Sequence, residues 1–475
     1  MFGISYKIQD SRLKKARRPE SEKIGNPAFR LSGFPALTCC VLCLLAVFLF
    51  AWSGLANDNK LILLSPHQES ITKEFATAFK KWYKARHGVD VQLEWLDQGG
   101  TSNIIRFARS EFEKNPGGIN VDIFFGGGTD PYLTFKEEGL LESCRLPDEI
   151  LSKIPEAYSG SPVYDPDFQW YGACLSGFGI LYNKQLLDWM DDLSKPETWA
   201  DLAKPEMAEW VSSADPRQSG SVHKMYELIL QSYGWEKGFE VITKMNANVK
   251  AFSRGASEIP RNVDLGEAAY GLAIDIYALT KIAEAGPDKL GYVMPEGETV
   301  INPDSIGIFK GAPHKELARS FVEFVIGEPG QKLWMLKVGE PDGPEEFALR
   351  RMSVMPHLYD QLGDRIDVPT NPFKWKTTLI YDHDKGSARR GVIGDLIGSM
   401  TIDMHDELMK AWKAVRKGGM KDAAVKRLVA VPISEEEAVR LGREKWDDQE
   451  FRNAKIAEWT RFAKGKYKEA AELAR

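Results

Sequence analysis

The pattern that most constrains the fold is a unit of strand, polar loop and helix that occurs three times between residues 61 and 139. The strands are short apolar runs at residues 61–64, 89–95 and 121–125. Each run is followed by a loop of small and polar residues, and then by apolar residues at the spacing of one helix face. Strands that alternate with helices predict a parallel sheet covered on both faces, and therefore an α/β fold.

The loops that follow these strands hold the first candidate ligand contacts. In open parallel sheets, ligands bind beyond the carboxyl ends of the strands, where such loops converge. Each loop also has a purely structural explanation, because Gly permits a tight turn and Ser or Thr caps a helix. Their recurrence after three strands favours a shared binding crevice, with the contacts Ser65, His67, Thr101, Ser102, Gly127 and Gly128.

A fourth polar loop, residues 214–221, leads into a helical pattern that begins at Val222. The first turn of a helix has unpaired N–H groups and carries the positive end of the helix dipole. Ser219, Gly220 and Ser221 are therefore placed either to cap the helix or to bind an anion. Taken with the three loops above, their position favours anion contact.

Two further segments complete the predicted crevice. Residues 170–184 form an extended segment with small residues in its middle, which we interpret as a crossing between two lobes, with Ser176 as a candidate contact. A later strand is predicted to run to Tyr277. If Ile274 faces the core, the alternation of a strand places Asp275 and Tyr277 together on the opposite face.

The side chains of His67, Asp275 and Tyr277 would together suit ferric iron, which binds imidazole, carboxylate and phenolate groups. The same three groups allow a different class of function, an exported α/β enzyme that uses them as acid and base on a phosphorylated small molecule. The chain contains no HExxH, P-loop, GxSxG or GxGxxG motif. We therefore expect binding without catalysis and without a cofactor, and ferric ion stays open as a ligand.

The first 56 residues differ in composition from the rest. Basic residues from Lys7 to Arg30 precede an uncharged run at residues 34–52, and Gly54-Leu55-Ala56 supplies the small residues that a signal peptidase requires. This pattern predicts a signal peptide over residues 1–56. An uncleaved anchor in the inner membrane is the alternative, because the run approaches the length of a bilayer crossing. Both interpretations place the remaining chain in the periplasm or another extracytoplasmic space.

Charge and cysteine content limit the remaining possibilities. A formal net charge of -6 over 475 residues argues against a dedicated nucleic-acid binder. After the leader only Cys144 and Cys174 remain, and the sequence allows either a disulfide or two buried thiols. From about Leu349 the chain becomes more charged and helical, which predicts a C-terminal extension that packs against the lobes and carries no chemistry of its own.

The order of the motifs between about residues 60 and 335 resembles the extracellular solute-binding proteins of ABC importers. The similarity is to the branch with ferric-ion, phosphonate, sugar-phosphate and thiamine-binding members. The residues that carry it are Leu64-Ser65-Pro66-His67, residues 121–128, residues 175–183, Ala214-Asp215-Pro216 with Ser219-Gly220-Ser221, residues 266–271 and Lys310-Gly311-Ala312-Pro313.

This resemblance implies a two-lobed periplasmic-binding-protein fold of type II, with an α-helical C-terminal extension over residues 340–475. Lobe 1 would comprise residues 57–171 plus 278–339, and lobe 2 would comprise residues 172–277. In this family the lobes close over a ligand by a hinge motion, and an ABC permease in the inner membrane is the partner. We expect a monomer that binds a small molecule or an ion.

The chain departs from the ferric-ion members at two places. They carry two adjacent tyrosines where this chain has Ile276-Tyr277, and an acidic ligand where it has Gly127-Gly128-Thr129. Both departures favour an organic anion, such as a phosphonate or a phosphorylated metabolite, over ferric ion.

Overall fold

The computed structural model describes residues 59–158, 160–375 and 379–475, so the predicted signal peptide or anchor lies outside the described residues. The strands are β1 (Lys60–Leu64), β2 (Gln92–Leu96), β3 (Ile123–Phe125), β4 (Leu141–Glu142), β5 (Ala157–Tyr158), β6 (Ser161–Pro162), β7 (Tyr171–Asn183), β8 (Val211–Ala214), β9 (Val249–Ser253), β10 (Tyr270–Ile274), β11 (Leu290–Val293) and β12 (Ile301–Phe309).

The helices before the extension are α2 (Glu69–His87), α3 (Thr101–Lys114), α4 (Asp130–Glu137), α5 (Asp148–Leu151), α6 (Lys184–Trp189), α7 (Gly220–Tyr233), α8 (Trp235–Ala247), α9 (Ile259–Asp264), α10 (Asp275–Ala285), α11 (Lys315–Ile326) and α12 (Glu328–Met335). The later helices are α13 (Pro356–Leu362), α14 (His383–Ala388), α15 (Arg390–Ile397), α16 (His405–Lys417), α17 (Asp422–Val429), α18 (Glu435–Glu444) and α19 (Gln449–Leu473). Among the described helices, none is long and apolar enough to cross a membrane.

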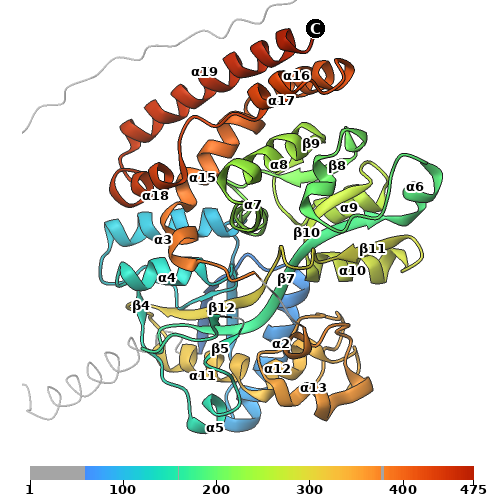
Figure 1. Cartoon of the computed structure of the whole chain (residues 1–475). Helices are drawn as coiled ribbons and strands as arrows, with labels where there is room; N and C mark the ends of the chain where they lie inside the picture. The colour runs from blue at the N-terminus through green and yellow to red at the C-terminus, as the bar shows by residue number, and fades with distance from the viewer. Residues whose placement is uncertain (1–58, 159, 376–378) are drawn as a thin grey trace, which may run out of the picture. The chain divides into compact units, whose positions relative to one another are not determined.

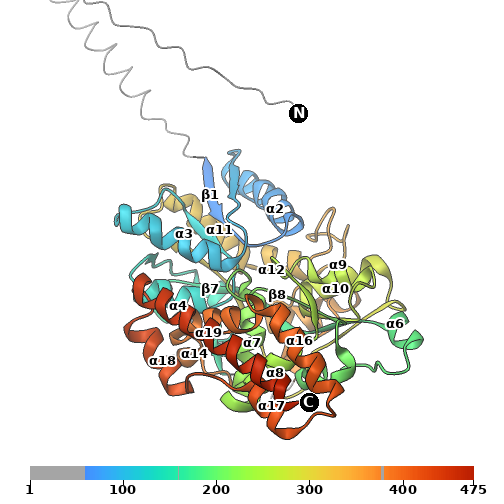
Figure 2. The same cartoon turned by 90° about the horizontal axis from the view of Figure 1, so that it is seen from above.

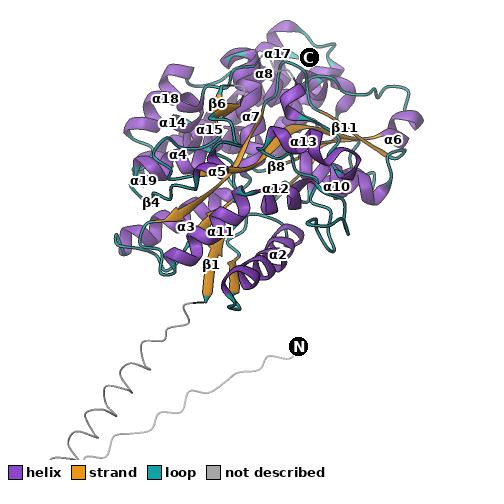
Figure 3. Ribbon diagram, turned by 90° about the horizontal axis from the view of Figure 1, so that it is seen from below, coloured by secondary structure: helices purple, strands orange, loops and turns teal. Residues whose placement is uncertain are grey.

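The main sheet has ten strands, and its central path runs β2-β1-β3-β12-β7-β10-β8-β9. At one end β1 pairs in parallel with β2 and β3, and at the other end β8 pairs in parallel with β9 and β10. Between these two groups, the long strands β7 and β12 run antiparallel to each other and to their outer neighbours. The α/β class is confirmed, and the three strands predicted between residues 61 and 125 do pair in parallel. The two crossing strands β7 and β12, for which no direction was predicted, run antiparallel to their neighbours. Figure 1 shows β7 as a long green strand that crosses the middle of the molecule, and Figure 3 shows strands such as β1 and β8 in orange among the purple helices.

In each parallel group, a loop and then a helix follow the carboxyl end of every strand. The three strand, loop and helix units predicted from the sequence are confirmed as β1 with α2, β2 with α3, and β3 with α4. The second group repeats this plan with β8, β9 and β10, which are followed by α7, α9 and α10. No strand was predicted at the position of β9.

One sequence prediction about this second group is wrong. Asp275 and Tyr277 do not lie on one face of a strand, because β10 ends at Ile274 and both residues belong to the first turn of α10. In a helix, residues two positions apart point in different directions, so the two side chains need not face the same space.

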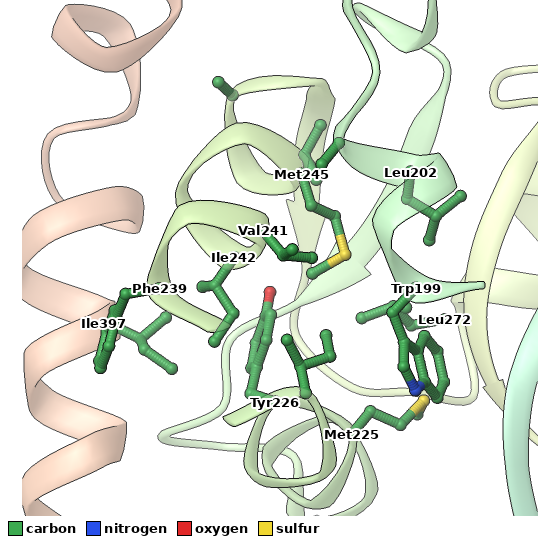
Figure 4. Close-up of a cluster of buried hydrophobic side chains, with 14 of the residues drawn as sticks. Trp199, Leu202, Met225, Tyr226, Phe239, Val241, Ile242, Met245, Leu272 and Ile397 are labelled. Atoms are coloured by element: carbon green, nitrogen blue, oxygen red, sulfur yellow. The ribbon is translucent and has the colours of Figure 1, made fainter. Parts of the chain in front are cut away.

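The apolar side chains form two large clusters, and each of them includes residues of β7. One cluster combines β1, β3, α2, α11 and α12 with residues 349–368, and the other combines α7, α8 and β10 with residues 381–474. The C-terminal extension is therefore divided between the two cores. Figures 1 and 2 show α16 and α17 beside α8, and Figure 1 shows α13 near α12. Figure 4 shows Ile397 of the extension beside Phe239 and Ile242 of α8.

The lobe boundaries stay a prediction, since residues 59–475 form one compact unit. Cys144 and Cys174 are both buried free thiols, so the structure shows no disulfide between them.

A buried ion pair attaches the extension to α7. Arg389, which immediately precedes α15, is fully buried and donates to Glu227 of α7 from Nη2 (2.7 Å) and Nε (3.1 Å), and to Glu435 from Nη1 (2.6 Å). Glu227 is also buried, so removing its partner would leave an uncompensated charge inside the protein.

We expect Arg389→Met to lower the free energy of unfolding by about 3–5 kcal/mol. Adding Glu227→Leu should recover a large part of this loss, because an apolar pair of similar volume replaces the ion pair. Urea denaturation of both variants at pH 7 measures the difference. If the single and double variants were equally stable, the loss in Arg389→Met would not come from an unpaired charge on Glu227.

Candidate functional site

The loops after both groups of parallel strands surround one cavity of about 740 Å³. Most residues predicted from the sequence line this cavity, namely Ser65, His67, Thr101, Gly127, Gly128, Ser176, Ser219, Gly220, Ser221 and Tyr277. Two do not. Ser102 lines a second cavity, between α3, α4 and the extension, and Asp275 is buried outside the cavity lining. The structure thus brings most of the predicted residues together, while their roles as ligand contacts stay predictions.

One end of the cavity, which we call the floor, is built on β7 and β12 around Asp304, Arg351 and His67. Oδ2 of Asp304 accepts from Nη1 of Arg351 (2.7 Å) and from Nε2 of His67 (3.0 Å), and Oδ1 accepts from the amide of Gly128 (2.7 Å). The register of β12 against β7 shifts at Asp304/Ser305. Such bulges re-aim a side chain, and here Asp304 lines the cavity although it lies within a strand.

The ionisation of the floor follows from this network. Arg351 and two further hydrogen bonds hold the pKa of Asp304 well below its usual value, even though burial alone would raise it. Burial lowers the pKa of His67 despite the nearby carboxylate, so its ring is neutral at pH 7. Asp304 and Arg351 therefore form a balanced ion pair beside a neutral imidazole. A second nitrogen of Arg351, Nε, is buried without a hydrogen-bond partner among the described residues.

Asp275 lies behind this floor. Its carboxylate accepts from the amides of Gly177 (2.9 Å) and Ile276 (2.7 Å). Burial raises its pKa to about 6 against the attraction of Arg351. The three residues proposed for iron are therefore not all available as metal ligands. His67 is hydrogen-bonded to Asp304, and Asp275 accepts hydrogen bonds from backbone amides. Among the described residues, no group of three His, Cys, Asp or Glu side chains could hold a metal ion.

The opposite end of the cavity, which we call the helix end, lies at the starts of α3 and α7. Ser219 caps α7 by accepting from the amide of Val222 (3.4 Å), so the capping interpretation is correct, and the same loop also lines the cavity. Gly220 and Ser221 provide first-turn amides, which have no acceptor inside the helix. The start of α3 follows Gly100, which provides no side-chain cap.

The two helix starts approach each other closely. A Cβ added to Gly100 would lie 2.5 Å from the carbonyl oxygen of Gln218, and one added to Gly220 would lie 2.9 Å from Cβ of Thr101. Glycine at these positions therefore permits the contact between the loop after β2 and the loop after β8. The structure shows the cavity with its two sides in contact.

The lysine and arginines of the cavity were not predicted from the sequence. Lys224 of α7 is buried and its Nζ lies 3.2 and 3.1 Å from the carboxylate oxygens of Asp130 of α4. Arg254 follows the unrecognised strand β9 and is exposed at the cavity. Arg351 and Arg390 come from the extension, which the sequence predicted to carry no chemistry. A strand assignment for β9 would have suggested Arg254, whereas no local motif marks the other residues.

Comparison with known proteins assigns the family. Residues 120–341 match the family described as bacterial extracellular solute-binding protein. An uncharacterized protein of Haemophilus influenzae is 30% identical over 287 residues, which are 60% of this chain and 78% of that protein. The chain belongs to the bacterial extracellular solute-binding proteins. The resemblance seen in the sequence is thus confirmed, and with it the function of a solute-binding component of an importer.

Solved structures agree on the fold. The periplasmic binding protein AfuA from Actinobacillus pleuropneumoniae, with exogenous fructose-6-phosphate bound, has a TM-score of 0.52 at 19% identity, over 74% of this chain and 97% of that one. Iron-bound HitA from Pseudomonas aeruginosa has a TM-score of 0.54 at 17% identity, over 71% of this chain and 99% of that one. These likenesses show the two-lobed periplasmic-binding-protein fold. They leave a quarter or more of this chain unmatched.

The close approach at Gly100 yields a test of closure. Its backbone (φ -73°, ψ 165°) suits any residue, so Gly100→Ala adds no backbone strain, and its effect comes from the contact with Gln218. The added methyl group should hold the two sides apart and increase the radius of gyration measured by small-angle X-ray scattering. Gly117→Ala is the control, because a Cβ there has no neighbour within 4 Å. An unchanged radius for Gly100→Ala would contradict this role of the contact.

The raised pKa of Asp275 predicts a pH dependence of stability. Because the folded protein holds this proton more tightly than the unfolded chain, the stabilisation is complete below about pH 4 and is lost as the pH rises through about 6. A shift of this size corresponds to about 3 kcal/mol. Urea denaturation at pH 4 to 7 should therefore show Asp275→Asn gaining stability relative to the wild type as the pH rises. A constant difference across this range would contradict the shift.

Proposed function

We propose that this protein is the extracytoplasmic binding component of an ABC importer that captures a phosphorylated or phosphonate metabolite in the cavity described above. The observation that carries the proposal is the division of the cavity into a helix end with unpaired donors and a floor without net charge. The ligand would bind through its anionic group at the helix end and through hydroxyl groups at the floor. Catalysis is not part of the proposal.

The helix end offers what a phosphate group requires. The first-turn amides of α7 point out of the helix with the positive end of its dipole, which is a general arrangement for binding phosphate and other anions. Two arginines of the cavity, Arg254 and Arg390, form no hydrogen-bonded ion pair among the described residues. Arginine matches the geometry of phosphate through paired donors, so a dianion would find charge and directed hydrogen bonds together.

The floor suits uncharged polar groups. The charges of Asp304 and Arg351 balance each other, and Ser65, Ser176 and Tyr277 add hydroxyl groups that can donate or accept. A sugar or polyol presents hydroxyl groups of the same kind. The fructose-6-phosphate bound to the structural neighbour AfuA is one molecule of this class.

Ferric ion is the second candidate, because the structural neighbour HitA is iron-bound. The cavity gives it less support, since His67 and Asp275 are committed to other partners and only one tyrosine stands at the start of α10. An enzyme that uses His67, Asp275 and Tyr277 is disfavoured for the same reason. Its proposed acid and base do not line the cavity together.

Location, partners and motion follow from this function. The protein would be exported by the signal within residues 1–56, and would act in the periplasm, either free or anchored to the inner membrane. It would work as a monomer and deliver its ligand to an ABC permease. The two predicted lobes would open and close about β7 and β12, the strands that connect them, as hinge closure requires.

Isothermal titration calorimetry with fructose 6-phosphate, fructose, inorganic phosphate and ferric citrate tests the ligand class. We expect fructose 6-phosphate to bind at least about 100-fold more tightly than fructose, because charged hydrogen bonds contribute about 1.5–3 kcal/mol each. Native mass spectrometry of the exported protein provides an independent measurement, in which a phosphorus-containing metabolite should co-purify. Iron at full occupancy, with no binding of any phosphorylated compound, would overturn the proposal.

A further inference from the structure

Arg390 is the first residue of α15 and lies outside residues 120–341, the part of the chain that matches the family. It nevertheless lines the ligand cavity. A Cβ added to Gly220 would lie 3.4 Å from Nη2 of Arg390, so the guanidinium stands in contact distance of the first turn of α7. The extension thus places a cation beside Gly220, in the first turn of α7.

The charge of this arginine is available to a ligand. Its nearest carboxylate oxygen is Oδ2 of Asp130, which is 3.9 Å from Nη1, too far for a hydrogen bond. Asp130 is instead held by Lys224, whose Nζ contacts both oxygens and lies over the ring of Tyr381, and by His383 at 3.5 Å. Since Lys224 balances Asp130 in a buried setting, the donors of Arg390 have no committed acceptor among the described residues.

The backbone of Arg390 is firmly held. The preceding residue, Arg389, forms the buried ion pair with Glu227 and Glu435. On the other side, Gly391 packs so closely on Trp446 that an added Cβ would lie 2.7 Å from its ring. A fixed backbone limits where the guanidinium of Arg390 can lie, so binding a ligand costs less conformational freedom than it would on a mobile loop.

We propose that Arg390 binds the phosphate group of the ligand and sets the preference for phosphorylated over unphosphorylated compounds. This inference rests on the function proposed above and extends it to a residue outside the family region. The planar guanidinium would donate to two phosphate oxygens, while the α7 amides bind the group from the other side. The C-terminal extension would then form a third wall of the ligand site, beside the two predicted lobes.

The test compares Arg390→Gln and Arg390→Lys with Arg443→Gln as a matched control. Arg443 is exposed, belongs to the same extension and lines the second cavity but not the ligand cavity. Calorimetry with fructose 6-phosphate should show affinity reduced about 10- to 100-fold in Arg390→Gln, and less in Arg390→Lys, which keeps the charge but loses the paired donors. The weaker affinity for fructose should stay unchanged, so the selectivity ratio falls. Arg443→Gln should bind as the wild type does.

Three results would overturn the inference, and each can be told from the others. If the wild type binds fructose 6-phosphate and Arg390→Gln binds it equally well, with unchanged circular dichroism and thermal stability, the role of Arg390 is wrong and the proposed function stands. If the wild type binds no phosphorylated compound in the panel, the proposed function and this inference fall together. An equal loss for fructose and fructose 6-phosphate would indicate a structural effect, and would also count against the inference.

Discussion

The antiparallel pairing of β7 with β12 is the constraint on which the rest of this structure depends. Both strands are buried along their whole length, so their backbone groups have to be paired within the sheet. Because the two strands lie between the parallel groups, they fix the relation of six loops to one cavity. The register shift at Asp304/Ser305 adds a functional consequence, since it accompanies the placement of a carboxylate at the cavity within an otherwise regular strand.

Charge pairing then decides which groups of the cavity remain available. A buried charge without a partner destabilises a protein. Both buried carboxylates that line the cavity have such a partner, because Asp304 pairs with Arg351 and Asp130 pairs with Lys224. The exposed Arg254 and the partly exposed Arg390 stay outside these pairs. The cavity therefore combines a hydrogen-bonding floor whose two charges balance with a helix end that carries two arginines outside these pairs, while the exposed carboxylates of Glu69, Asp97 and Glu258 also line it. This division gives a physical reason to prefer a ligand with one anionic group and several hydroxyl groups.

The extension is a structural part of the binding unit. Residues 349–368 complete one apolar core, and residues 381–474 complete the other, so the segment passes from one side of the cavity to the other. Arg351 reaches the floor from the first part, and Arg390 reaches the helix end from the second. No sequence pattern indicated these two roles, because each arginine lies in a charged segment where exposed arginines are common. Their surroundings become special only when the chain folds.

The sequence alone determined the local elements and the polar loops. Apolar periodicity and small-residue turns act over a few residues, so they revealed β1 to β3 with their helices and the cap at Ser219. The motif series also indicated the family. Tertiary structure decided what depends on distant partners: the pair Asp130 and Lys224 joins residues 94 apart, and Asp304 and Arg351 are 47 apart. Asp275 was predicted in a strand but lies in the first turn of α10, because β10 ends at Ile274. Ion pairing and burial are properties of the packed chain, and no local pattern records them.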